Sequence, residues 1–215
     1  MAVRQWITPL KGLDSLSQTE SPMPTPGPSE VLVEIRAVSL NYRDVEGKSA
    51  KDIPCRVHAH QFEVTKGEYK HHKTAEQDAT IVPCSDMCGV VTQVGSDVTK
   101  WTVGDRVLST FLPDHQTGQV TEKELGRSLG LPQDGVLASH RVFPDYGLVN
   151  APSFMSDEEA ATLPIASVTA WMSINGMRPL GQSGGKDEYI LLQGTGGVAI
   201  AGLQIAKAAG AKGKS

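Results

Sequence analysis

Residues 189–210 read YILLQGTGGVAIAGLQIAKAAG, and this stretch decides the fold class of the chain. Its opening apolar run, residues 189–193, predicts a short buried strand. Glycines cluster at residues 194–197, and apolar side chains then recur at three- and four-residue spacing, which predicts a helix over residues 198–209. Strand, glycine turn and helix together form the first half of a dinucleotide-binding βαβ unit.

The glycine turn has the spacing that an approaching pyrophosphate requires. Gly194, Gly196 and Ala199 fit the pattern G-x-G-x-x-G/A. Glycine permits a tight turn and lets the backbone come close to the anion. The helix N-terminus beyond it offers unpaired N–H groups and the positive end of a dipole. The alternative is a tight turn that binds nothing.

The composition excludes several other classes of protein. The chain has 215 residues, of which 39% are hydrophobic and 20% charged, as in ordinary globular proteins. A net charge of −4 provides no basic surface for nucleic acid. We expect no signal peptide and no membrane span, because the N-terminus lacks an apolar core and no long apolar run occurs. Three cysteines favour a reducing compartment, which we take to be the cytoplasm.

Short strands dominate the first part of the chain, residues 1–150. Residues 31–38 alternate between apolar and polar side chains, which predicts a strand with one buried face. Further short strands are predicted within residues 89–95, 103–108 and 140–149. The pattern favours an all-β, barrel-like domain.

Helical signals begin after residue 150. Ser156 and Glu159 have the spacing of a capping box, which predicts a helix start. That helix is expected to break at Pro164, and a second is expected over residues 166–177. The sequence therefore predicts a β domain over residues 1–150 and the start of an α/β domain over residues 151–215.

Five sets of motifs follow one another along the chain: NYRD at 41–44, PCSDMCG at 83–89, VGDRV at 103–107, ATLP at 161–164 with TAW at 169–171, and GTGGV at 194–198. In this order they resemble the medium-chain dehydrogenase/reductase superfamily, in its zinc-independent, quinone-oxidoreductase-like branch. The resemblance implies a GroES-like β-barrel domain followed by the start of a Rossmann domain, an α+β and α/β arrangement. It also implies hydride transfer between NAD(P)H and a carbonyl, alcohol or activated alkene.

The same resemblance assigns catalytic roles to residues 41–44. Asn41 and Tyr42 would donate hydrogen bonds to a substrate carbonyl as the hydride adds, and Asp44 would orient its neighbours. For Asp44 the alternative role is a structural ion pair with Arg43.

The implied cofactor contacts lie in the second part of the chain. They are Thr169, Gly194, Gly196, Gly197 and Val198. The family branch favours NADP over NAD, while the residue that discriminates between them is not identified. Trp171, close to the first of these contacts, is expected in the core.

The resemblance implies no zinc. Asn41 stands where zinc-dependent members carry a Cys ligand, and Ser85 where they carry the His of a Gly-His-Glu motif. A serine hydroxyl is a poor zinc ligand. A rival metal site would use Cys55, His58, His60, His71, His72, Cys84 and Cys88. Their spacing matches no standard zinc site, and the alternative is histidines that face solvent and two small cysteines in the core.

Residues 47–63, GKSAKDIPCRVHAHQFE, form an unusual insert. Removing them restores the spacing of the family. The insert opens with Gly-Lys-Ser, and residues 213–215 are the same tripeptide. Because a splice-donor sequence can encode it, we hypothesise that both stretches are translated introns and that the chain is a truncated, inactive form. A lineage-specific loop and a genuine short form are the alternatives, and the transcript sequence decides between them.

Two other functions stay open at this point, a non-catalytic GroES-like barrel module and a zinc-dependent alcohol dehydrogenase. Under the leading interpretation the partner is a small carbonyl, quinone or enone substrate, with no nucleic acid and no membrane. The resemblance also implies that the full-length protein forms a homodimer. Quenching of tryptophan fluorescence by NADPH separates the oxidoreductase from the non-catalytic module.

Overall fold

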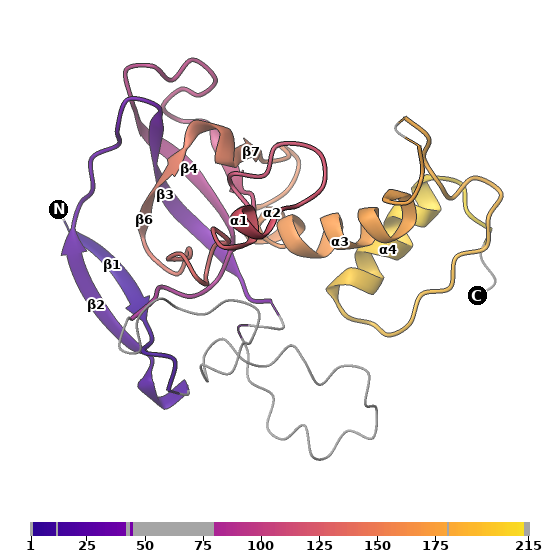
Figure 1. The fold of residues 1–215 in the computed structure, drawn as a ribbon, viewed down its shortest axis with the longest axis horizontal. Helices are drawn as coiled ribbons and strands as arrows, with labels where there is room; N and C mark the ends of the chain where they lie inside the picture. The colour runs from indigo at the N-terminus through magenta and orange to yellow at the C-terminus, as the bar shows by residue number, and fades with distance from the viewer. Residues whose placement is uncertain (1, 12, 42–43, 45–79, 180, 213–215) are drawn as a thin grey trace. The chain divides into compact units, whose positions relative to one another are not determined.

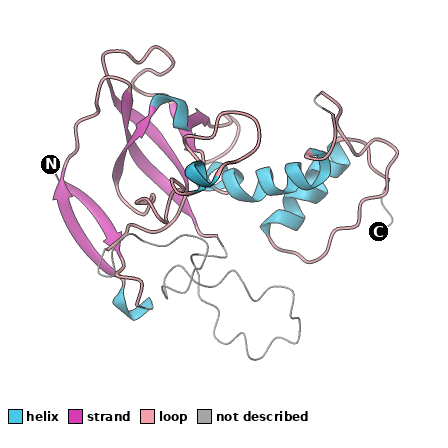
Figure 2. Ribbon diagram, in the orientation of Figure 1, coloured by secondary structure: helices cyan, strands magenta, loops and turns pink. Residues whose placement is uncertain are grey.

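The computed structural model describes residues 2–11, 13–41, 44, 80–179 and 181–212 (Figure 1). By its contacts the chain divides into two compact units, Met1–Ala161 and Thr162–Ser215. All the described strands belong to the first unit and the two long helices to the second; Figure 2 distinguishes strands from helices by colour. The insert at residues 47–63 lies outside the described residues, as do Tyr42 and Arg43.

The first unit contains a five-stranded sheet, in line with the predicted all-β domain. Its strands lie in the order β6-β3-β4-β5-β7, and every neighbouring pair is antiparallel. Their bounds are β3 Glu30–Ser39, β4 Asp86–Val94, β5 Arg106–Ser109, β6 His140–Pro144 and β7 Leu148–Asn150. The single strand expected within residues 140–149 is two strands, because a 3-10 turn, η3 Asp145–Gly147, separates them.

The predicted alternation along β3 points its apolar face into the core. Val31 and Val33 are fully buried and pack in one cluster with Val91 of β4 and Phe143 of β6. Trp101 closes this cluster, and its indole Nε1 donates to the carbonyl of Asp145 at 2.7 Å. Burial of such a set of large apolar side chains is the main force that holds the sheet closed.

A further antiparallel pair, absent from the sequence predictions, precedes this sheet. It consists of β1 Ala2–Ile7 and β2 Ser17–Pro22, with a 3-10 turn, η1 Leu13–Ser15, between them. Residues 137–139 connect the pair to β3: the Trp6 N–H donates to the Leu137 carbonyl and the Ile35 N–H to the Ser139 carbonyl, both at 2.9 Å. These bonds extend the sheet toward a barrel.

Two short helices complete the first unit. Helix α1, Glu122–Leu125, has a capping box of its own. Helix α2, Asp157–Ala161, starts at the predicted capping box, which is confirmed: the Ser156 N–H donates to the Glu159 carboxylate at 2.9 Å, and the Glu159 N–H to the Ser156 hydroxyl at 3.2 Å. Because α2 packs on β3 and β4, the first unit reaches further than the boundary near residue 150 that the composition indicates.

The second unit is built on two packed helices, α3 Leu163–Asn175 and α4 Gly197–Ala208. The predicted break between two helices is present, but it falls at Thr162 and not at Pro164. Pro164 lies in the first turn of α3, where its missing N–H costs nothing. The expected core position of Trp171 is wrong. Its neighbour Ala170 is buried near Gly202 of α4, whereas Trp171 is 50% exposed.

The strand predicted over residues 189–193 does not form. Tyr189 makes a single parallel bridge with Lys212, and none of the described residues pairs with residues 190–193. Leu191 is 95% exposed as a result. A parallel strand is stable when neighbours flank it and both its faces are covered, and the described part of the second unit supplies neither. None of the described helices is long and apolar enough to cross a bilayer.

Candidate functional site

The C-terminal end of β3 and the N-terminal end of β4 lie side by side at one end of the sheet. Ser39, the last residue of β3, is paired in register with Asp86, the first residue of β4. Asn41 follows closely after Ser39, and Ser85 directly precedes Asp86. Asn41 and Ser85, the two positions that the resemblance aligns with zinc ligands, therefore lie at the same end of these two strands. This end of the sheet is the candidate substrate site.

Asp44 holds Asn41 in a tight turn. The Asp44 carboxylate oxygen Oδ2 accepts the Asn41 backbone N–H at 2.9 Å, and the Asp44 N–H donates to the Asn41 carbonyl at 2.9 Å. The side-chain amide Nδ2 of Asn41 is buried and has no hydrogen-bond partner among the described residues. Buried donors are normally paired, so this amide is an exception that calls for an explanation. Tyr42 and Arg43, the other members of the predicted group, are not among the described residues.

Buried hydroxyl groups support the start of β4. The Ser109 hydroxyl donates to the Ser85 carbonyl at 2.6 Å, and the Ser85 hydroxyl donates to the Asp86 carboxylate at 2.7 Å. All three residues are at most 1% exposed. Cys84, just before them, has φ of +69°, a left-handed conformation that favours glycine, and the resemblance places the glycine of the Gly-His-Glu motif at this position.

The described part of the chain holds no group of three or more His, Cys, Asp or Glu side chains arranged for a metal ion. Cys84 and Cys88 are buried and form no disulfide within the described residues, which agrees with the alternative of two core cysteines. The other members of the rival metal site, Cys55, His58, His60, His71 and His72, lie outside the described residues, so that site stays a hypothesis.

Arg106 joins β5 to the segment that leads into α2, a cluster that the sequence analysis missed. Its Nη2 and Nε donate to the Asp157 oxygen Oδ1 at 2.6 Å and 3.0 Å, and Nη2 also donates to the Met155 carbonyl at 3.0 Å. The Cys88 thiol donates to the same carboxylate at 3.5 Å. Arg106 belongs to the VGDRV stretch, but no local pattern pairs it with a carboxylate so distant in the sequence.

The surroundings of Cys88 in this cluster disfavour the thiolate form of its side chain. Burial, together with the Asp157 carboxylate, raises the pKa of the Cys88 thiol to about 11, so the thiol stays protonated near neutral pH. Hydrogen bonds from Arg106 lower the pKa of Asp157 below its ordinary value of 3.8. The cluster is therefore a structural tie between the sheet and the segment before α2.

Replacing Asp157 with asparagine is expected to lower the melting temperature by a few degrees at pH 7. A carboxylate whose pKa is lowered on folding stabilises the protein above its unfolded pKa and loses that effect as the pH falls through the folded pKa. The difference between Asp157→Asn and the original chain should therefore shrink below about pH 4. Thermal unfolding of both proteins between pH 3 and 7 measures this difference in melting temperature. Glu34→Gln, which removes an exposed ion pair with Arg36, is the control and should change little. A difference that does not vary with pH would contradict the ion pair.

The glycine turn in the second unit leaves open space above the start of α4. Gly194 has φ of +88°, and a Cβ on Gly194 or Gly196 would meet no atom within 4 Å. Gly196 is the N-cap of α4 and no side chain caps this helix end. The first N–H groups of the helix lack intrahelical acceptors, so this donor set fits the pyrophosphate of a dinucleotide.

Thr169 lies in α3, the helix that packs against α4. A Cβ on Gly197 would stand 3.4 Å from the Cβ of Ala166 in α3, and Thr169 follows Ala166 by one helical turn on the same face. Gly194, Gly196, Gly197 and Val198 lie together at the start of α4, and Thr169 is an exposed residue of the neighbouring helix α3. Val198 is 42% exposed at the start of the helix.

Known proteins share both parts of this arrangement. The model of the alcohol dehydrogenase GroES-like domain matches residues 27–153. A zinc-type alcohol dehydrogenase-like protein of Schizosaccharomyces pombe is 36% identical over 94% of this chain and 52% of its own length. A chloroplastic quinone-oxidoreductase of Triphysaria versicolor is 27% identical over 91% of this chain and 49% of its own length.

Solved structures show the same fold. A Sinorhizobium meliloti protein assigned to the alcohol dehydrogenases superimposes with a TM-score of 0.74 at 33% identity, covering 98% of this chain and 55% of its own. The chain spans about half the length of the curated relatives that it matches.

Proposed function

The chain belongs to the medium-chain dehydrogenase/reductase superfamily, a group of oxidoreductases whose first domain is the alcohol dehydrogenase GroES-like domain, and on this premise we propose a function for it. It supplies the substrate domain and the first nucleotide-binding turn of an NAD(P)(H)-dependent oxidoreductase. The reaction is hydride transfer to or from a carbonyl, alcohol or activated alkene. NADP is the favoured cofactor, because the chain resembles the quinone-reductase branch.

The observation that carries this proposal is the buried amide of Asn41, which has no hydrogen-bond partner among the described residues. Its Nδ2 donates to the substrate oxygen, and this hydrogen bond strengthens as negative charge develops there. Asp44 acts by holding the Asn41 backbone, so that the donor is already in place when substrate arrives. Tyr42, which stands between them in sequence, is the second proposed donor.

The glycine turn supports the cofactor part of the proposal. Gly194, Gly196 and Gly197 leave space for the pyrophosphate, and the N–H groups at the start of α4, Val198 included, donate to it. Thr169 contributes from α3. When bound, NAD(P)(H) supplies or accepts the hydride.

The hydrogen bonding of Ser85 supports chemistry without zinc. Its hydroxyl is fully buried and donates to Asp86, so it offers no free ligand where the resemblance expects the metal-binding histidine. Asn41, at the other ligand position, presents an amide. Metal analysis of the purified protein tests this part, and a stoichiometric zinc ion would overturn it.

The exposed stretch at residues 190–193 supports a further part of the proposal: residues 1–215 do not turn over substrate by themselves. Leu191 is 95% exposed and the parallel sheet that normally holds the dinucleotide is not formed by the described residues. Hydride transfer depends on close placement of the nicotinamide against substrate, and one pyrophosphate turn does not provide it.

NADPH oxidation with quinones and enones tests the proposal directly. The purified chain is assayed beside the full-length Schizosaccharomyces pombe relative, and NADPH binding is measured on the same samples. Saturable binding without turnover supports the proposal. Turnover comparable to that of the relative would contradict the inactivity of the chain, and absence of any binding would favour a non-catalytic barrel module.

Asn41→Leu is expected to leave the free energy of unfolding within about 0.5 kcal/mol of the original value or to raise it, because the amide that it removes has no described partner to lose. Asp44→Ala is the matched comparison. It removes the acceptor of the Asn41 N–H from a residue that is 7% exposed, and should cost about 1–3 kcal/mol. Denaturant unfolding of both variants measures the difference. A clear loss of stability in Asn41→Leu would show that the amide has a structural partner.

A further inference from the structure

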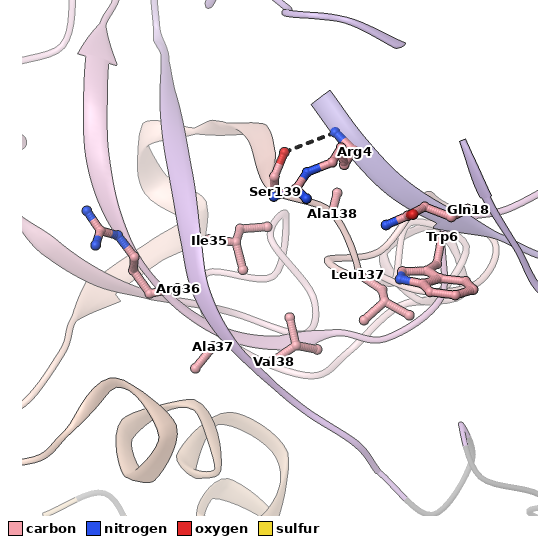
Figure 3. Close-up of a pocket in the computed structure, with 10 residues that line it drawn as sticks. All are labelled: Arg4, Trp6, Gln18, Ile35, Arg36, Ala37, Val38, Leu137, Ala138 and Ser139. Atoms are coloured by element: carbon pink, nitrogen blue, oxygen red, sulfur yellow. Dashed lines mark hydrogen bonds between the residues drawn. The ribbon is translucent and has the colours of Figure 1, made fainter. Parts of the chain in front are cut away.

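A pocket of about 280 Å³ lies between β1, β3 and the segment 137–139 (Figure 3). Its lining reaches Val38, next to Ser39, but does not include Asn41, Asp44, Ser85 or Asp86. Its lining includes Arg4 and Trp6 of β1, Ile35 and Val38 of β3, and Leu137 and Ser139. We propose that this pocket binds a small monoanion with a flat apolar body, such as an aromatic carboxylate. This binding is separate from the proposed hydride transfer and does not rest on it.

Arg4 supplies the positive charge. Figure 3 shows its guanidinium beside Ala138 and Ser139, at one end of the pocket. The backbone N–H of Arg4 donates to the Ser139 hydroxyl at 3.1 Å, which fixes the residue to the segment 137–139. Glu20 faces Arg4 in the β1–β2 register, yet no ion pair joins Arg4 to a carboxylate within the described part of the chain. The guanidinium therefore has donors free for a ligand carboxylate, which it binds in a two-pronged geometry.

Among the described residues that line the pocket, Arg4 is the one cation without an anionic partner, and it sets the ligand charge at one. Arg36 also lines it, but this side chain points away from the others in Figure 3 and donates to Glu34 at 3.0 Å. A single free guanidinium matches a single carboxylate. A dianion would bring a second charge onto the apolar walls, and the cost of desolvating it would go uncompensated.

The walls favour a flat apolar body. Ile35, Val38 and Leu137 form the apolar floor, and the Trp6 ring, 39% exposed, lies beside Leu137 at the other side (Figure 3). An aromatic ring placed here would contact both aliphatic carbons and an indole face, an arrangement that favours aromatic ligands. The volume is at the lower end of small-molecule sites, so the ligand has one or two rings.

Titration of the 215-residue chain with 2-naphthoate tests the proposal, with NMR of 15N-labelled protein to locate binding and calorimetry to measure affinity. We expect saturable shifts of the Arg4, Ser139 and Trp6 indole N–H signals, with the Asn41 and Asp86 signals unchanged. The uncharged isostere 2-naphthamide should bind at least about tenfold more weakly. Absence of saturable shifts at the pocket, or equal affinity for the two compounds, would overturn the proposal.

Two arginine variants of the same pocket sharpen the test. Arg4→Gln should weaken 2-naphthoate binding about tenfold or more, while Arg36→Gln should change it less than about threefold, because Arg36 is already paired. Both side chains are solvent-facing, and circular dichroism checks that both variants stay folded. Equal losses in the two variants would contradict the role of Arg4. Trp6→Leu, as a separate variant, should weaken both naphthalene compounds.

Discussion

A valine in place of Gly196 is expected to reduce NADPH affinity by about tenfold or more while leaving the fold intact. Gly196 has φ of −76°, which valine adopts without strain, and a Cβ there would meet no protein atom within 4 Å. The same open space is where the pyrophosphate approaches the start of α4, so the branched side chain displaces the anion. We expect the free energy of unfolding to change by less than about 1 kcal/mol, since glycine is only a moderate N-cap.

Tryptophan fluorescence during an NADPH titration measures this effect. Lys207→Gln is the control, because Lys207 lies in the last turn of the same helix and its loss should leave the affinity nearly unchanged. Affinity retained in Gly196→Val would show that the turn is a structural connection that binds no dinucleotide.

An alanine in place of Gly135 is expected to destabilise the barrel by about 3 kcal/mol or more. The N–H of Gly135 donates to the Val82 carbonyl at 2.6 Å, so the two backbone segments lie in close contact. A Cβ on Gly135 would overlap the carbonyl oxygens of Pro83 and Cys84. Both are backbone atoms, and the overlap is relieved only by separating the segments and breaking the hydrogen bonds between them.

Denaturant unfolding followed by the fluorescence of the tryptophans, with Trp101 buried in the core, measures this loss. Gly126→Ala is the matched control. Gly126 has φ of −65°, and a Cβ there would stand 3.4 Å from its nearest neighbours, so this variant should change stability by less than about 1 kcal/mol. Equal stability of Gly135→Ala and Gly126→Ala would contradict the close approach of residues 135 and 83–84.

Local patterns predict most of the regular structure. The alternation in residues 31–38 yields β3, the Ser156–Glu159 spacing yields the start of α2, and the apolar spacing after residue 197 yields α4. The β1–β2 pair was missed because β2, with the sequence SQTESP, has no apolar alternation. The pair is attached to the rest of the fold by hydrogen bonds between β1 and residues 137–139, and no local sequence pattern predicts such distant bonds.

The strand predicted over residues 189–193 shows why periodicity alone is insufficient. An apolar run becomes a parallel strand only where neighbouring strands supply hydrogen bonds, and Tyr189 finds one such partner, Lys212. The prediction that Trp171 lies in the core was wrong for a related reason. The aromatic character of a residue does not show which face of its helix is covered by the rest of the fold.

The sequence predicts only part of the candidate site. The family resemblance points to Asn41 and Asp44, and the strand register then explains why the segments after β3 and before β4 meet. The hydrogen bonds between Asn41 and Asp44 and the pairing of Arg106 with Asp157 depend on tertiary geometry. Sequence spacing therefore identifies the residue types, and the fold determines which of them act together.

The most direct test of the central claim is an NMR titration of the 15N-labelled chain with NADPH. The proposed function predicts saturable shifts of the amide signals of Gly194, Gly196, Gly197 and Val198, which are the donors that would face the pyrophosphate. Shifts that are absent from this turn at millimolar NADPH, or that occur only in the first unit, would contradict a dinucleotide-binding oxidoreductase.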